Sequence, residues 1–215
     1  MCCFLDCSPL VYYNLYFYNM LKELLTNQEI ILASGSPRRQ KFFRDLDIPY
    51  IIKLKPVEEI FPDHLKAEEI TNFLAELKAK AFKNELKENQ ILITSDTIVY
   101  IDDTALGKPK DFEDACSMIR KLSGKSHDVI TSVTFATSDS QKTLNHTTKV
   151  FFGDISEEEI QYYVKNFEPY DKAGGYAIQE WIGLIGIEKI EGSYNNVVGL
   201  PTQLVYATLK ELLKN

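Results

Sequence analysis

The sequence of 215 residues predicts an α/β fold with a mixed sheet flanked by helices. Strand-like apolar runs alternate with amphipathic, helix-like segments, and some strand-like runs are expected to pair antiparallel. The hydrophobic fraction of 45% and the aromatic fraction of 12% are ample for a core. The length fits one large domain, or one domain with two lobes.

The first half of the chain contains a clear helix signal. Ser36 can cap a helix over residues 37–46, and Pro37 suits its first position, where a missing N–H costs nothing. The other elements expected here are a short helix at 20–27, a strand at 30–34, a strand at 50–55, an acidic loop at 56–64, a long helix at 67–84 and a strand at 91–101.

The second half contains two further helix starts. Asp111 can cap a helix that runs to about Leu122, with Gly124 just past its end. Ser156 and Glu159 form a capping box that begins a helix to about Asn166. The other elements expected here are a hairpin-like pair of strands at 128–137 and 146–153, a strand at 182–190 and a final helix at 200–214.

The net charge of −7 argues against general binding of nucleic acid or of an anionic membrane, both of which require a basic face. Any anion site must therefore be a local basic cluster in an acidic protein. The four cysteines have no disulfide or zinc-site spacing, which favours a reducing compartment and a cytoplasmic location.

Residues 1–19 form an atypical, apolar and aromatic extension that is too interrupted to span a bilayer. They lack the basic region and the cleavage site of a signal peptide. A signal peptide or an anchor at the membrane surface remains an alternative interpretation. We favour an extension peripheral to the domain, or a start codon placed upstream of a natural start at Met20. Residues 20–215 are expected to form a single domain.

The segment at residues 32–39, LASGSPRR, predicts a strand, a tight loop and a helix whose first turn carries Arg38 and Arg39. Cations are unfavourable at a helix N-terminus, and a bound anion would offset that penalty. The segment therefore predicts a phosphate site. The alternative is a small-residue turn with two solvated arginines.

Asp96 interrupts the apolar strand ILITSDTIVYI. A carboxylate there is costly unless it is paired, hydrogen-bonded or facing a cleft. Because Ser95 and Thr97 flank it with polar groups, we interpret Asp96 as a general base or a metal ligand. The alternative is an acid near the strand end that pairs with a lysine at the edge of the core.

Other polar residues are weaker candidates when each is taken alone. Lys108, in a Gly-Lys-Pro turn, can reach a phosphate or simply lie in a solvated turn. Lys78 on the long helix, taken alone, is expected to face solvent. Glu58 and Glu59 offer oxygen ligands for a metal, or simply surface charge.

Gln179 ends the segment at 171–179, whose two glycines permit a tight bend or a close approach to a ligand. Its side-chain amide can donate and accept hydrogen bonds, which suits recognition of the edge of a nucleotide base. The alternative is a simple turn with a partly exposed glutamine. The histidines have no metal-ligand spacing, and His127 is expected in a structured turn.

Together these segments resemble the Maf family of nucleoside triphosphate pyrophosphatases. The resemblance implies an α/β fold of the Maf or ITPase-like type, with two lobes around a deep cleft, in a single catalytic domain at 20–215 that is often homodimeric. It also implies hydrolysis of a nucleotide to a monophosphate and pyrophosphate with a divalent metal, Mg²⁺ or Mn²⁺. The matching motifs are LASGSPRR at 32–39, LAELKA at 74–79, SDT at 95–97, GKP at 107–109, LSGKSH at 122–127, DKAGGYAIQ at 171–179 and GSYNNVVGLP at 192–201.

The resemblance also assigns roles to individual residues. Asp96 matches the proton acceptor, and Glu59 matches an acidic loop position associated with activity; both are candidate metal ligands. Four residues match those that hold the triphosphate: Ser34, Arg38, Lys78 and Lys108. Three match positions that separate subfamilies, and here they resemble the dTTP/UTP type: Arg38, Thr97 and Gln179.

The chain departs from the family pattern at 180–182, Glu-Trp-Ile, where a glycine-rich turn is usual. This stretch lies beside the base-reading Gln179 and bears on base preference. Two rival functions stay open: a non-catalytic nucleotide-binding regulator of growth or division, and a phosphatase that releases single phosphates. The intact Asp96, Lys78 and Lys108 argue against the regulator, and the released product separates all three.

Overall fold

A computed structural model describes residue 21 and residues 23–213. The expectations about 1–19 and about a start at Met20 lie outside these residues. Residues 21, 23 and 24 are helical, in agreement with the short helix expected at 20–27. Among the described residues, no helix is both long enough and apolar enough to cross a membrane.

The core of the fold is a mixed sheet of seven described strands, as the sequence predicts. The strands follow the order β2-β1-β3-β5-β6-β7, and β4 pairs with β3 off this path. β1 runs parallel to β2 and β3, whereas the pairs β3–β5, β5–β6 and β6–β7 are antiparallel. The bounds are β1 Glu29–Leu32, β2 Ile51–Ile52, β3 Gln90–Ile101, β4 Thr104–Leu106, β5 Ser126–Ala136, β6 Gln141–Phe152 and β7 Ile187–Glu191.

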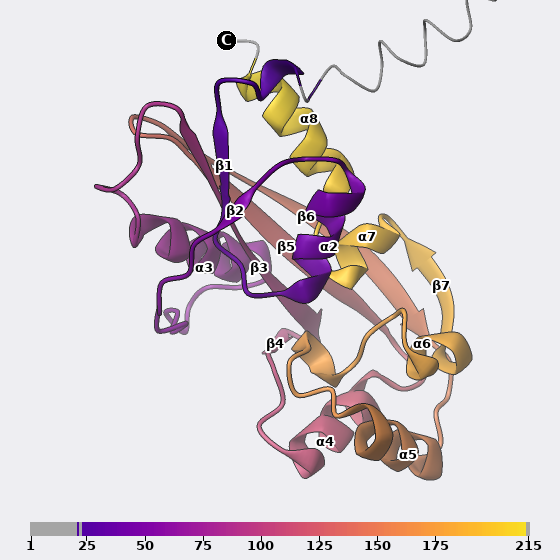
Figure 1. Cartoon of the computed structure of the whole chain (residues 1–215). Helices are drawn as coiled ribbons and strands as arrows, with labels where there is room; N and C mark the ends of the chain where they lie inside the picture. The colour runs from indigo at the N-terminus through magenta and orange to yellow at the C-terminus, as the bar shows by residue number, and fades with distance from the viewer. Residues whose placement is uncertain (1–20, 22, 214–215) are drawn as a thin grey trace, which may run out of the picture.

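Two groups of helices, α2 with α8 and α4 with α5, lie toward opposite ends of the long strands and form two lobes, while α3 packs along the sheet against β3 and β5 (Figure 1). One apolar core joins Ile93 of β3 to Phe43 of α2 and Val205 of α8. A second joins Val99 of β3 to Ile119 of α4. The two lobes expected around a cleft are thus present, and β3 runs through both. The helix bounds are α2 Pro37–Asp45, α3 Glu68–Lys80, α4 Phe112–Leu122, α5 Glu157–Phe167, α6 Trp181–Gly186, α7 Tyr194–Val198 and α8 Thr202–Leu212.

The capping signals read from the sequence are confirmed. The Ser36 side chain accepts a hydrogen bond from the first turn of α2, which has Pro37 at its start. The Asp111 side chain accepts one at the start of α4. Ser156 and Glu159 form the complete capping box of α5, each bonding to the backbone of the other. Such caps satisfy N–H groups that have no partner inside the helix.

The strand expected at 182–190 is wrong in its first half. Residues 181–186 form the short helix α6, and the strand β7 covers only 187–191. Two glycines in this apolar run pack closely against neighbouring residues. A Cβ on Gly183 would lie 1.9 Å from the Ile178 carbonyl oxygen, and one on Gly186 would lie 2.7 Å from the side chain of Ile155. Tertiary packing, rather than strand propensity, decides this segment.

Three other segments have boundaries that differ from those expected from the sequence. The polar connection expected before 146 is short, because β6 begins at Gln141 and a turn closes through Thr137 N–H and the Ser140 carbonyl oxygen at 2.9 Å. The strand expected at 50–55 is limited to Ile51–Ile52, and the helix expected at 67–84 ends at Lys80.

Two short elements were not predicted. β4 pairs with β3 through a two-residue turn in which Asp102 and Asp103 have φ of 49° and 55°, a turn type that favours such residues. α7 at 194–198 begins at the cap residue Ser193 and precedes α8. The expected structured turn at His127 is also wrong, because this residue lies in β5.

Candidate functional site

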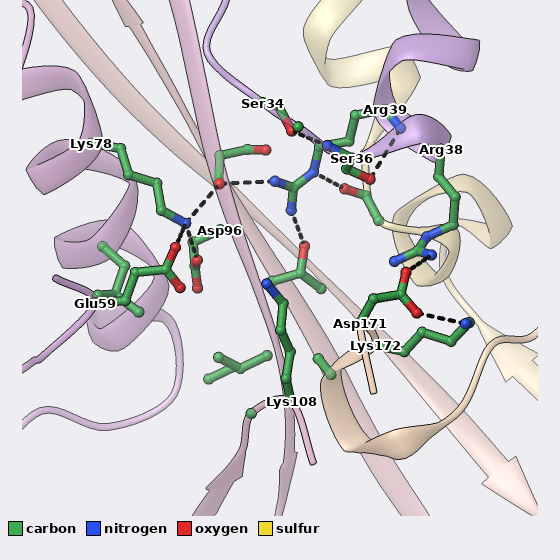
Figure 2. Close-up of a pocket in the computed structure, with 18 of the residues that line it drawn as sticks. Ser34, Ser36, Arg38, Arg39, Glu59, Lys78, Asp96, Lys108, Asp171 and Lys172 are labelled. Carbon is green, nitrogen blue, oxygen red and sulfur yellow. Dashed lines mark hydrogen bonds and ion pairs between the residues drawn. The ribbon is translucent and has the colours of Figure 1, made fainter. Parts of the chain in front are cut away.

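A cavity of about 780 Å³ opens between the lobes, where β1 ends and α2 begins. Figure 2 shows charged side chains on both sides of it, with the Arg39 guanidinium between them. All eight candidate site residues line this one cavity, although they come from six separate segments of the chain. They are Ser34, Arg38, Glu59, Lys78, Asp96, Thr97, Lys108 and Gln179.

The cavity exists at this place because β3 is longer than its parallel neighbour. The last residue of β1, Leu32, pairs with Ile93, and Ala33 N–H donates to the Ile93 carbonyl oxygen before the chain turns away. Between Ile93 and Val99, where the pairing with β4 begins, this edge of β3 has no strand beside it. Asp96 therefore lies at the carboxyl end of parallel strands, where α/β sheets commonly bind ligands.

The two-residue period of β3 sends alternate side chains to opposite faces of the sheet. Thr94 and Asp96 face α3: Thr94 Oγ1 donates to the Ala75 carbonyl oxygen, and Asp96 meets Lys78. Thr97 points the other way and meets Arg39 of α2. Neighbouring residues of one strand thus serve opposite walls of the cavity.

Lys78 joins the two carboxylates of the α3 side. Its Nζ lies 2.6 Å from Asp96 Oδ1 and 2.9 Å from Glu59 Oε1. Burial raises the pKa of Glu59, but the nearby Lys78, then Lys108 and Arg39, bring that pKa below its ordinary value. Asp96 is therefore paired with a lysine, as the alternative interpretation expected, although it lies in the middle of β3 and not near its end. It also lines the cavity.

The donor set fits a divalent cation shared with a substrate. Asp96 and Glu59 reach the same ammonium group, so their carboxylates lie close together. Mg²⁺ is often held by one or two carboxylates, with phosphate oxygens completing its shell. Among the described residues, no group of three or more His, Cys, Asp and Glu side chains is arranged to hold a metal.

The polar side chains of the segment 32–39 differ in their partners. Ser34 is buried, and its Oγ accepts from Ser36 N–H at 3.2 Å, which shapes the turn into α2. The two arginines diverge (Figure 2). Arg39 is held by the protein, whereas Arg38 reaches across to Asp171 at 2.9 Å.

Arg39 ties three parts of the site together. Its guanidinium donates to the carbonyl oxygens of Gly199 at 2.9 Å and Ser95 at 3.0 Å, and to Thr97 Oγ1 at 2.9 Å. The Thr97 hydroxyl also bonds with Thr131 at 2.9 Å. Both hydrogen bonds of the Thr97 hydroxyl are therefore made to other residues of the protein.

Asp171 and Lys172 are site residues that sequence reasoning missed. Asp171 binds Arg38, and it binds the buried Lys172 at 2.7 Å. Burial raises the pKa of Asp171, but hydrogen bonds from Lys172 and Arg38 lower it below its ordinary value. The available signal was a charged pair, separated by one alanine from the two glycines at 174–175.

Two candidates retain polar groups that can meet a ligand. Lys108 is exposed and Figure 2 shows it reaching into the cavity, while Gln179 is exposed at the cavity wall. Neither makes a side-chain hydrogen bond with any other residue that the structure describes.

The cavity is basic although the protein is acidic. Among the described residues, its lining has six basic and three acidic side chains, an excess of three positive charges, against −7 for the whole chain. A local field of this sign attracts and retains anions. The local basic cluster expected for an anion site is therefore present.

His127 supports the cavity wall from the core. Its Nε2 lies 2.7 Å from the hydroxyl of Tyr176, which lines the cavity, and its buried Nδ1 has no partner within the described part of the chain. Burial lowers the pKa of His127 from 6.5 to about 4. The imidazole is therefore neutral at physiological pH.

This burial predicts an acid-sensitive contribution to stability. The unfolded chain binds a proton at His127 near pH 6.5 and the folded chain near pH 4, so stability falls as the pH drops between these values. The contribution amounts to roughly 3 kcal/mol across that window. Free energies of unfolding from urea titrations at pH 4 to 7 should show a steeper loss for the wild type than for His127→Gln. His64→Gln, at an exposed histidine, is the control, and its free energy of unfolding should change with pH as that of the wild type does. A pKa above 6 for His127, measured by NMR, contradicts the prediction.

The fold and the cavity define an α/β protein with a basic cavity at the carboxyl ends of parallel strands. Residues 29–212 match the family model described as Maf-like protein, and the chain belongs to this family. The resemblance drawn from the motifs is thereby confirmed.

Relatives of high identity match nearly the whole chain. A protein from Christiangramia forsetii named dTTP/UTP pyrophosphatase is 68% identical over 196 residues, which are 91% of this chain and 100% of the relative. One of the same name from Phocaeicola vulgatus is 49% identical over 191 residues, 88% of this chain and 99% of the relative. A solved structure of the Staphylococcus aureus Ham1 protein is 16% identical, with a TM-score of 0.44, and the match covers 84% of this chain and 100% of that one.

Proposed function

We propose that this chain hydrolyses nucleoside triphosphates of the dTTP/UTP type to the monophosphate and pyrophosphate. The names of relatives up to 68% identical support this activity. The observation that carries the proposal is the basic cavity in which Asp96 lies 2.6 Å from Lys78. Such a cavity supplies both the charge to hold a triphosphate and a carboxylate to act on water.

The cationic side chains hold the triphosphate. Lys78 and Lys108 approach the cavity from α3 and from the turn after β4, and Arg38 approaches from the opposite wall. Ser34 and the N-terminus of α2 add polar groups of the kind that bind phosphate. Positioning and charge neutralisation of this sort contribute most of the catalysis in reactions at phosphorus.

Asp96 acts on the attacking water. Its carboxylate orients the water and accepts a proton while the water oxygen bonds to the α-phosphorus. The bond from that phosphorus to the oxygen bridging to the β-phosphate breaks, and pyrophosphate leaves with the bond's electron pair. Lys78 holds Asp96 in place through the 2.6 Å contact.

Asp96 and Glu59 would hold the divalent cation, Mg²⁺ or Mn²⁺. When bound there, the cation neutralises phosphate charge, and the two carboxylates that flank Lys78 provide its protein ligands.

Base preference depends on Gln179, Thr97 and Arg38. The Gln179 amide is exposed at the cavity wall and can pair with the edge of a uracil or thymine. Thr97 acts through Arg39, which its hydroxyl binds at 2.9 Å. A polar site discriminates against bases that leave its groups unpaired, so we expect uracil and thymine nucleotides to react best.

A product screen tests the activity. The wild-type chain is incubated with canonical and modified nucleoside triphosphates in the presence of Mg²⁺ or Mn²⁺, and pyrophosphate and orthophosphate are measured separately. We expect pyrophosphate with dTTP and UTP, and no product once the metal is chelated. Release of orthophosphate alone indicates a phosphatase, and binding without any product indicates a regulator; either result contradicts the proposal.

The same proposal includes a homodimer, as the family resemblance implies, and a cytoplasmic location, as the cysteine pattern favours. Light scattering of the purified chain should give twice the mass of 24.7 kDa. A monomeric mass contradicts this part and leaves the proposed chemistry unaffected.

A further inference from the structure

Gln179 lies on a β-turn whose two ends are held by one side chain. Glu180 N–H donates to the Ala177 carbonyl oxygen at 3.0 Å, which makes Ile178 and Gln179 the central residues of the turn. The hydroxyl of Tyr163 accepts from Ala177 N–H at 3.2 Å and donates to Glu180 Oε2 at 2.6 Å. One oxygen atom thus bonds to both the first and the last residue of the turn.

Tyr163 is well placed for this role. It belongs to α5 and is fully buried in the core that contains Val99 and Ile119, so its hydroxyl has little freedom to move. Burial, followed by the hydrogen bond to Glu180, raises the pKa of Tyr163. The phenol therefore keeps its proton and remains a donor to Glu180 at physiological pH.

Glu180 is held from its other side as well. Its Oε1 lies 3.3 Å from the Nζ of buried Lys172, which binds Asp171, and Asp171 binds Arg38. The turn that carries Gln179 is therefore linked through side chains to Arg38 at the start of α2. Charged hydrogen bonds of this kind are stronger and more directional than neutral ones.

We infer that Tyr163 and Glu180 are positioning residues that set base selectivity by fixing the turn carrying Gln179. The inference rests on the proposed function, because it takes Gln179 as the group that meets the base. Gln179 itself makes no side-chain hydrogen bond with any described residue, so the backbone of its turn determines where its amide lies. Loosening that turn should relax the choice of base while leaving Asp96 and Lys78, on the α3 side of the cavity, in place to act on water.

Two conservative variants test the inference. Tyr163→Phe keeps the ring and removes the hydroxyl, and Glu180→Gln keeps the shape and removes the charge. For each, kcat and KM are measured with dTTP, UTP and CTP. We expect the ratio of kcat/KM for dTTP over CTP to fall about tenfold, mainly through KM, with kcat for dTTP changed less than about twofold.

Glu157→Gln is the matched control, because Glu157 lies on the same helix in an exposed ion pair with Arg120 at 2.7 Å. It should keep the wild-type ratio. An unchanged ratio in folded Tyr163→Phe and Glu180→Gln overturns the inference. An equal loss with all three nucleotides, together with a lower unfolding temperature, also overturns it, since it indicates a purely structural role.

Binding of monophosphates separates this inference from the proposed function. Calorimetry with dTMP and CMP reports base selectivity without hydrolysis. If the wild-type chain releases no pyrophosphate but prefers dTMP, and both variants lose that preference, the proposed activity fails and the positioning role stands. If the wild type releases pyrophosphate and the variants keep their preference, the activity stands and the positioning role fails.

Discussion

Replacing Asp96 by asparagine is expected to lower pyrophosphate release at least about a hundredfold in a chain that still folds. The amide has nearly the size of the carboxylate, and its oxygen can still accept a hydrogen bond from Lys78, which lies 2.6 Å away. The amide cannot accept a proton from water, and it is a poorer ligand for a divalent cation. The substitution therefore removes the proposed chemistry while it preserves the packing of β3.

The measurement is the initial rate of pyrophosphate release with dTTP, alongside thermal unfolding and circular dichroism of each variant. Asp102→Asn is the matched control: Asp102 follows β3, is exposed and pairs with Lys125 at 3.2 Å. Its φ of 49° is one that asparagine tolerates. The control should react at the wild-type rate. A folded Asp96→Asn chain that also does so removes Asp96 from the mechanism.

The sequence predicted those elements whose signals are local. Ser36, Asp111 and Ser156 each cap the helix assigned to them, because capping depends on residues only three positions apart. β3 was predicted within one residue, since a largely apolar run of eleven residues, rich in β-branched side chains, has few other structures available. Helix α6 was mistaken for strand because its conformation depends on contacts of Gly183 and Gly186 that are not visible in an apolar run.

The site was predictable where a residue contradicts its surroundings. Asp96 was predicted as a site residue because a carboxylate in an apolar strand is costly unless it has a partner or a function. Ser34 and Arg38 were predicted because they lie where a strand meets a helix. The bond between Arg38 and Asp171 joins residues 133 positions apart, and no local pattern indicates it. Lys172 received no individual role from the sequence, yet it is buried between two acids.

Gly183 lies where no side chain can be accommodated. An added Cβ would be 1.9 Å from the carbonyl oxygen of Ile178 and 2.5 Å from its carbonyl carbon. These atoms belong to the backbone of the turn that carries Gln179, so they cannot move aside as a flexible side chain would. Gly107 offers the matched comparison, because a Cβ there meets nothing within 4 Å.

Gly183→Ala is therefore expected to destabilise the chain by about 3 kcal/mol or more, since the clash forces the backbone of α6 or of the turn to shift. In a chain of this length, the unfolding temperature should drop by roughly 10 °C, measured by calorimetry at one protein concentration. Gly107→Ala should stay within about 2 °C of the wild type, because its added methyl group meets open space. Equal unfolding temperatures for the two variants would mean that α6 does not pack against Ile178 in solution. The turn bearing Gln179 would then be held by Tyr163 and Glu180 without the packing of α6.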